Sequence, residues 1–185
     1  MKKLFLAFAV LCGAAVAAQE TKSAETGVGQ MSFFAEVGGP GILFSANIDR
    51  RFAKSSLGWG ARAGFGFVTT FNDQYVTQPG GGGYYTSGRQ LSVATFPLQV
   101  NYIFGKPTSQ HTFEVGAGVT ITGRKIDLFD SYYDQDRSSL FGTASFMYRR
   151  QPVGGGFSWR IGFTPIVGNG FIQPSGGISV GYNFN

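Results

Sequence analysis

The sequence has 185 residues, enough for one domain, and it is rich in glycine and aromatic residues, with 29 Gly, 19 Phe and 8 Tyr. Charged residues make up only 14%, against about 25% in soluble domains, which argues against a surface that meets water on all sides. The formal net charge of +5 comes from scattered basic residues. Because no run of Lys or Arg could follow a phosphate backbone, we expect no nucleic-acid partner.

The first 18 residues have the three parts of a secretory signal peptide. Two lysines form the positive part, an apolar run extends to Leu11, and the small residues at 15–18 suit a cleavage site that leaves Gln19 first. The apolar run is shorter than the about 17–25 residues that a transmembrane helix needs. Leu11 before Cys12 disfavours lipidation, and ordinary cleavage leaves a mature chain without cysteine or disulfides.

Residues 19–30 are small and polar and predict a flexible leader, and residues 31–185 predict one all-β domain. Within it, eight segments alternate apolar residues with small or polar ones, the period of a strand whose two faces meet different surroundings. In order they are 31–38, 42–50, 58–70, 91–105, 112–122, 139–149, 157–166 and 177–184. The segment 112–122 is the clearest, and its length matches the about 9–11 residues that a tilted strand needs to cross a bilayer. We predict a closed up-and-down antiparallel transmembrane β-barrel of about eight strands.

Alternation alone does not say which face of a barrel is outside, since a soluble lipocalin-like barrel alternates with its apolar residues inward. Here the polar face is mostly Gly, Ser and Thr, which suits a narrow lumen better than a water-covered exterior. Its few charges, Glu36, Arg62, Glu114 and Arg160, have both signs. We expect them to pair in a lumenal charge network, because an unpaired buried charge is costly. The alternative is that the same groups line a narrow conduit.

Aromatic residues gather at one end of the predicted strands if the first strand starts on the periplasmic side. They predict an aromatic girdle at one membrane interface, as outer-membrane barrels have: Phe33, Trp59, Tyr102, Phe104, Phe113, Tyr148, Phe157, Trp159, Tyr182 and Phe184. The connections at that end, 51–57, 106–111 and 150–156, are short. At the opposite end 71–90 and 124–138 are long, and 38–41 is a short exception that predicts a tight turn.

These features together resemble the small bacterial outer-membrane β-barrel proteins of the OmpX, OmpW and OmpA-barrel type, and especially the uncharacterised barrel proteins of Bacteroidetes-like bacteria. The resemblance spans the mature chain and carries no catalytic motif. It implies a Gram-negative cell outer membrane, with outer-membrane lipid and, during insertion, the barrel-assembly machinery as partners. In such families the machinery reads a last strand that ends in an aromatic residue. Tyr182 and Phe184 fit that role, although Asn185 follows them.

Residues suited to enzyme chemistry are scarce. The one histidine, His111, lies in a predicted periplasmic turn, whereas barrel enzymes that act on lipid A use a His with a Ser near the outer rim. Ser109 beside it fits ordinary turn chemistry. The glycine runs 80–83 and 154–156 lack the Lys-Ser/Thr of a phosphate-binding loop. We therefore expect no enzyme, no catalytic or metal site and no cofactor.

The long outer segments are the best candidates for recognition, because exposed aromatic residues with polar neighbours suit binding. The candidates on the second of them are Asp127, Phe129, Asp130, Tyr132, Tyr133, Asp134 and Asp136. Their aspartates could take Ca²⁺, although the spacing does not fit an EF-hand. The sequence thus predicts an outer-membrane barrel with a structural, adhesive or surface-recognition role toward an unidentified ligand. A small passive pore and a soluble lipocalin-like carrier are the alternatives.

Overall fold

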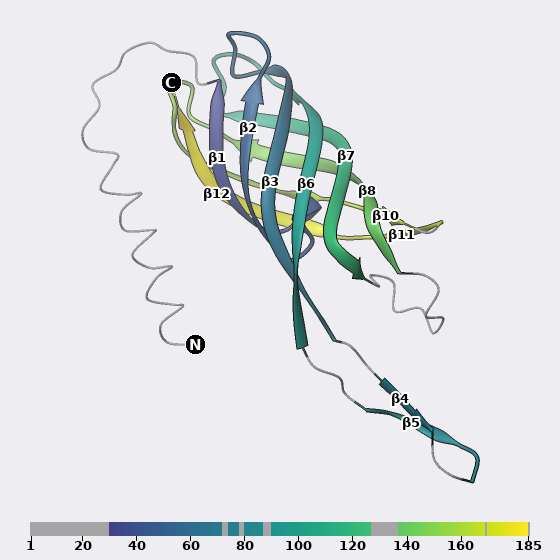
Figure 1. Cartoon of the computed structure of the whole chain (residues 1–185). Coiled ribbons are helices and arrows are strands. Elements are labelled where there is room, and N and C mark those ends of the chain that lie inside the picture. The colour runs from purple at the N-terminus through teal and green to yellow at the C-terminus, as the bar shows by residue number, and fades with distance from the viewer. Residues whose placement is uncertain are drawn as a thin grey trace, which may run out of the picture.

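The structure is a computed structural model that describes residues 30–71, 74–77, 80–86, 90–126, 137–168 and 170–184, so the predicted signal peptide and most of the leader lie outside it. Eight strands of these ranges form the wall of a barrel (Figure 1), each antiparallel to the next. They are β1 (Met31–Gly38), β2 (Phe44–Arg51), β3 (Gly58–Phe71), β6 (Gln90–Phe104), β7 (His111–Ile126), β8 (Ser138–Arg150), β9 (Gly156–Phe163) and β12 (Gly176–Phe184). The predicted eight-stranded antiparallel architecture is confirmed.

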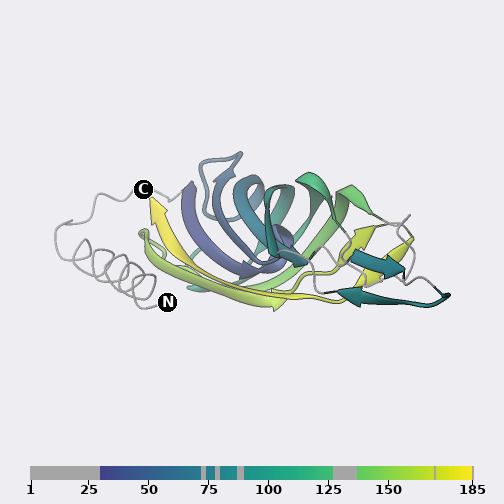
Figure 2. The same cartoon turned by 60° about the horizontal axis from the view of Figure 1, so that its bottom comes forward.

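The first and last wall strands close the barrel. β1 pairs with β12 over its whole length, from Met31 opposite Phe184 to Gly38 opposite Gly177. Because β12 also pairs with β9, and β9 with β8, the ladder runs around without a break (Figure 2). Closure removes the unpaired edges that an open sheet would expose. Among the described residues, no helix is long and apolar enough to cross a membrane.

The two faces of the wall are sorted as the alternation predicts. Val115 and Val119 on β7 and Ile161 on β9 point outward, with 36%, 38% and 46% of their surface exposed. Glu114 and Thr120, the residues adjacent to the two valines, are fully buried. The pattern holds on the other wall strands, whose exposed large residues are apolar and whose buried ones are mostly polar. This is the reverse of a soluble barrel, in which the apolar face turns inward. The outer surface is therefore suited to hydrocarbon.

Small inward residues make room for the larger polar ones. Gly118 lies so close to β6 that a Cβ there would come within 2.7 Å of Gln99 Cγ, and at Gly64 a Cβ would meet the side chain of Asn47. Glycine at these positions lets neighbouring polar side chains lie flat against the wall. The glycine-rich inward face of the sequence thus reflects a crowded lumen.

The connection between β1 and β2 is short, as predicted, but it folds into the barrel. Gly39–Gly41 form a single 3₁₀ turn whose three residues are buried inside the barrel. Thr120 Oγ1 on β7 donates a hydrogen bond to Pro40 O at 2.6 Å, and Thr95 Oγ1 on β6 donates to Gly41 O at 3.1 Å. Hydroxyls from the opposite wall therefore draw this turn inward as a plug. We call residues Gly38–Ile42 the inward turn.

Several predicted boundaries are wrong, each for a local reason. The second strand begins at Phe44 and not at position 42, because Ile42 has a φ of 76° and ends the inward turn. β7 continues to Ile126 through a register shift, so Arg124 and Lys125 belong to the strand and not to the outer loop. The seventh strand stops at Phe163 because Pro165 has no backbone N–H to donate.

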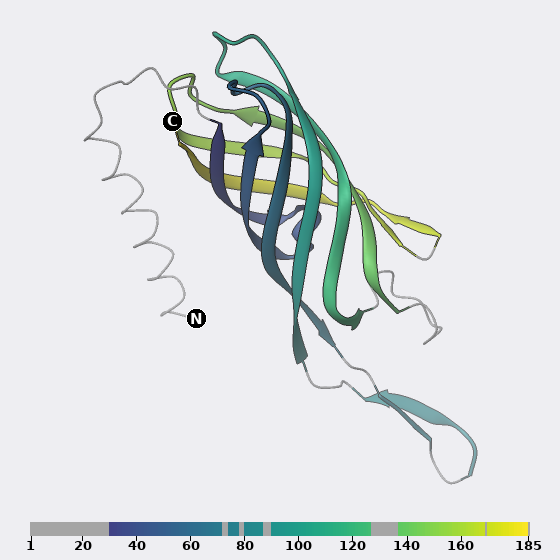
Figure 3. The ribbon, with the colours of Figure 1, turned by 45° about the horizontal axis from the view of Figure 1, so that its top comes forward.

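Short strands extend the wall at the end where the predicted long connections lie. β10 (Ile166–Gly168) resumes the pairing of β9 with β8 and forms a hairpin with β11 (Phe171–Gln173). β4 (Gln74–Thr77) and β5 (Gly83–Thr86) form a separate hairpin that projects far beyond the barrel (Figure 3). We call this the loop end. The opposite end, with the short connections, Gln30 and Phe184, is the turn end.

Candidate functional site: the lumenal charge network

The charged side chains of the lumen come from strands on opposite sides of the barrel. The four predicted network residues all point inward: Glu36 on β1, Arg62 on β3, Glu114 on β7 and Arg160 on β9. Each lies two residues from other buried residues of its strand, as the alternation of a strand requires. The structure brings all four predicted network residues together. It also adds three buried charges that the predicted set omits: Asp49, Arg51 and Arg149.

Glu114 is the centre of the network. Its Oε1 accepts a hydrogen bond from Arg62 Nη2 at 2.6 Å, and its Oε2 lies 3.1 Å from Arg149 Nη1 and 3.2 Å from Arg160 Nη1. Asn101 Nδ2 donates a further bond to Oε1 at 3.3 Å. One carboxylate thus holds guanidinium groups from β3, β8 and β9, which ties three parts of the wall together across the lumen.

Asp49 on β2 is a second acidic centre. Its Oδ2 lies 3.2 Å from Arg149 Nη1 and 3.8 Å from Arg160 Nη1, and its Oδ1 accepts a hydrogen bond from Arg51. Arg51 also donates to Gly58 O at 2.9 Å. The sequence alternation assigns Asp49 and Arg149 to the inward faces of their strands, so both could have been included in the predicted network. Arg51 carries no such signal, because its position reads as part of a turn.

Glu36 is the least satisfied member. Its Oε1 lies 3.7 Å from Arg62 Nη1, and neither of its oxygens accepts a hydrogen bond from a described residue. Phe34, also inward on β1, lies under two guanidinium groups: Arg160 Cζ is 3.3 Å and Arg62 Cζ 4.8 Å from its ring centroid. Cation–π attraction of this kind stabilises a cation away from water. It compensates for the excess of four guanidinium groups over three carboxylates in the described lumen.

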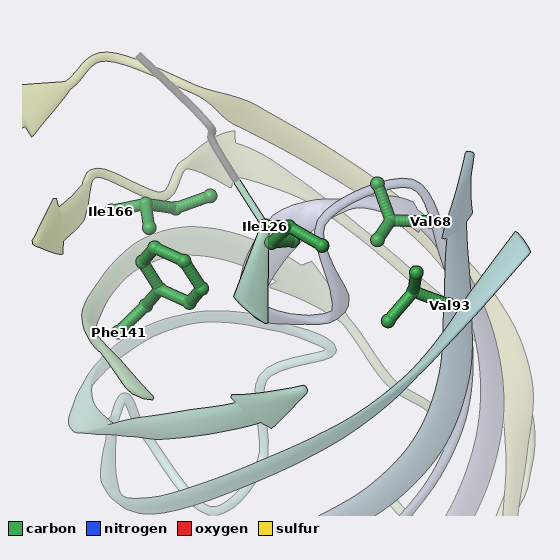
Figure 4. Packing of buried hydrophobic residues seen from close by; sticks show 5 residues of the cluster. All are labelled: Val68, Val93, Ile126, Phe141 and Ile166. Atoms are coloured by element: carbon green, nitrogen blue, oxygen red, sulfur yellow. The ribbon is translucent and has the colours of Figure 1, made fainter. Parts of the chain in front are cut away.

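The lumen is apolar toward the loop end. Five buried side chains form a cluster there (Figure 4), with Ile126 between the pair on β3 and β6 and the pair on β8 and β10, and Ile42 of the inward turn packs against it. They are Val68, Val93, Ile126, Phe141 and Ile166. The charge network, the inward turn and this cluster therefore follow one another along the barrel axis.

The predicted girdle residues lie next to one another in the pairing register near the turn end. Trp59 contacts Tyr102, with ring centroids 5.2 Å apart, and Tyr148 contacts Trp159 at 5.4 Å. Phe33, Phe104, Phe113, Phe157, Tyr182 and Phe184 occupy register positions beside these pairs. β2 is the one wall strand with no residue in the predicted girdle. Phe52, which follows β2 and is 68% exposed, lies beside Trp59 and completes the girdle there.

The other predicted sites are placed as follows. His111 Nδ1 lies within hydrogen-bond distance of the Tyr148 hydroxyl, and Ser109 Oγ accepts from His111 N at 3.1 Å. Ser109 thus serves the turn, as its sequence context predicts. The recognition candidates on residues 127–136 lie outside the described part of the chain.

No family model matches the chain, and no curated protein is similar enough to count as a match. Among solved structures, the crystal structure of the N-terminal β-barrel domain of Pseudomonas aeruginosa OprF is similar, with a TM-score of 0.51 and 15% sequence identity. The match covers 84% of this chain and 96% of that one. The chain shares the fold of that barrel domain. Because the identity is low, the roles of the lumenal residues must come from their own geometry.

Proposed function

We propose that this protein is an integral outer-membrane β-barrel of the OmpA-barrel type, with a filled lumen and a structural, adhesive or recognition role at its loop end. The observation that carries the proposal is the sorting of the wall, apolar outward and polar inward, in a closed barrel. The similarity to the OprF barrel domain supports the outer membrane as its location. The girdle and short connections at the turn end support an orientation with that end in the periplasm.

The contents of the lumen favour a structural barrel over a passive pore. A barrel of about eight strands has an interior that is just filled by side chains. Here it contains guanidinium groups held by Glu114, the inward turn and an apolar cluster in succession. Ions would have to displace paired charges and then pass an apolar layer. The loop-end hairpins, above all β4 with β5, then provide the surface for interactions outside the membrane.

We expect the purified protein to fractionate with the outer membrane, to show heat-modifiable gel migration and to form no steady channel in a planar bilayer. A matched variant, Glu114→Ala, removes the centre of the network and is the change most expected to admit ions. Steady conductance of the wild-type protein that changes with Arg160→Ala favours the passive pore instead. Recovery from the soluble fraction contradicts both proposals.

A further inference from the structure

The outer face of the barrel carries one site whose chemistry matches a membrane phospholipid. A groove of about 590 Å³ crosses β2, β3, β6 and β7 on the apolar exterior. Its floor is made by small residues, Ala61, Ala63 and Ala117, and its sides by larger ones such as Ile48 and Leu98. The exposed lining of this groove is mostly apolar, which suits a hydrocarbon chain.

Two arginines line the groove, Arg50 and Arg62, but the side chain of Arg62 is buried in the lumenal charge network, so Arg50 is the one whose charge faces outward. Arg50 on β2 is exposed on the outer face, paired in register with Met31 and Ala61. Its side chain makes no hydrogen bond or ion pair with any residue that the structure describes. Two residues further toward the turn end, Phe52 N donates to Trp59 O at 3.0 Å, which places two aromatic residues just beyond Arg50. A long arginine at this depth can reach the headgroup region while its stem stays on apolar surface.

Among the residues that the structure describes, Arg50 has no counterion on this face. The acidic residues that the structure describes, Glu36, Asp49 and Glu114, are all buried in the lumen. An uncompensated cation on the hydrocarbon-facing side of a barrel is unfavourable. A phosphate with an attached acyl chain satisfies both features, because guanidinium binds phosphate well and the groove accepts the chain.

We propose that this groove binds one phospholipid, with its phosphate on Arg50 and an acyl chain along Ala61 and Ala63. The lipid comes from the leaflet at the turn end, so the site rests on the proposed outer-membrane location. A second copy of the chain fits less well, since a two-fold contact over the groove brings two Arg50 side chains together.

The test is native mass spectrometry of the folded protein from detergent micelles doped with dioleoyl phosphatidylglycerol or with dioleoylglycerol, which lacks the phosphate. We expect wild-type protein to retain one phosphatidylglycerol about tenfold more tightly than the diacylglycerol, and Arg50→Gln to abolish that preference. Ala63→Leu, which fills the floor, is expected to weaken both lipids about fivefold.

Two matched controls remove similar groups elsewhere. Arg150→Gln removes another arginine near the turn end, one that already donates to Gln110 at 3.0 Å, and Ala35→Leu enlarges a β1 alanine outside the groove. Both should leave retention of the two lipids unchanged. Equal loss with Arg150→Gln, or an unchanged preference with Arg50→Gln, overturns the site.

Lipid retention tests the groove, and membrane fractionation tests the proposed function, so the two proposals can fail separately. Heat-modifiable migration and membrane fractionation are measured on every protein in the series. A protein that inserts but shows no preference for the phosphate-bearing lipid contradicts the site alone. A wild-type protein that does not fractionate with membranes contradicts the location, and the site with it.

Discussion

Replacing Glu114 with Gln is expected to destabilise the barrel by about 3–5 kcal/mol, the usual cost of removing one partner from a buried ion pair. Glu114 contacts Arg62, Arg149 and Arg160 at 2.6, 3.1 and 3.2 Å, and all of these side chains are nearly inaccessible to solvent. The amide keeps the shape of the side chain but leaves three guanidinium groups with only Asp49 and Glu36 nearby. The measurement is urea unfolding of the protein refolded into lipid vesicles.

The matched control for this prediction removes a cation as well as the carboxylate. In the double variant Glu114→Gln with Arg149→Gln, the excess of positive charge falls, so the combined loss should be smaller than the sum of the two single losses. A cost below about 1 kcal/mol for Glu114→Gln in a folded barrel contradicts a dry lumen. Such a small cost is expected where water solvates the arginines, as in an open pore.

Placing an arginine at Val119 is expected to cost about 2–4 kcal/mol, the range for a cation at the midplane of a membrane barrel. Val119 is exposed on the outer face of β7, six residues beyond the girdle residue Phe113. At about 3.3 Å per residue and a tilt of about 40°, it lies roughly 15 Å above the girdle. That is near the middle of the apolar band of about 25 Å.

Val115 is the matched control on the same strand. It faces outward like Val119 but pairs with the girdle residue Tyr102, so Val115→Arg should cost only about 0–1 kcal/mol near the interface. Unfolding in vesicles compares the two variants directly. Equal costs at both positions contradict a depth-dependent lipid environment around β7.

The sorting of residues between the two faces could be predicted because it follows from a period of two. Each strand alone shows which side chains share a face, and the scarcity of charge shows which face meets water. Glu36, Arg62, Glu114 and Arg160 could be assigned to one face in this way. Asp49 and Arg149 were available by the same parity, since they alternate with the outward Ile48 and Tyr148.

The inward turn could not be predicted from its own residues. Gly38–Gly41 has the composition of any tight turn, and its direction depends on hydroxyls that lie far away in the sequence, on Thr95 and Thr120. The space to receive it depends on the small side chains of the facing wall. Similarly, the extension of β7 through a register shift to Ile126 depends on pairing with Ser138, which no local pattern specifies.

The position of Arg50 has a similar explanation. The alternation along β2 places Arg50 on the outward face and Arg51 on the inward face. Nothing in the sequence shows that Arg51 pairs with the buried carboxylate of Asp49 while Arg50 has no such partner. The difference arises from closure of the barrel, which places Asp49 and Arg51 together inside. Sequence patterns specify faces, whereas partners across a lumen or groove come from the three-dimensional register.

The most direct test of the central claim measures what touches the outward apolar face. A nitroxide attached to Val119→Cys or Ile161→Cys in the vesicle-inserted barrel should collide readily with oxygen, which concentrates in hydrocarbon, and rarely with a water-soluble nickel complex. The same label on Lys106→Cys in an exposed connection at the turn end should show the opposite preference. Nickel access at Val119 and Ile161 equal to that at the turn contradicts a lipid-facing wall, and with it the membrane barrel.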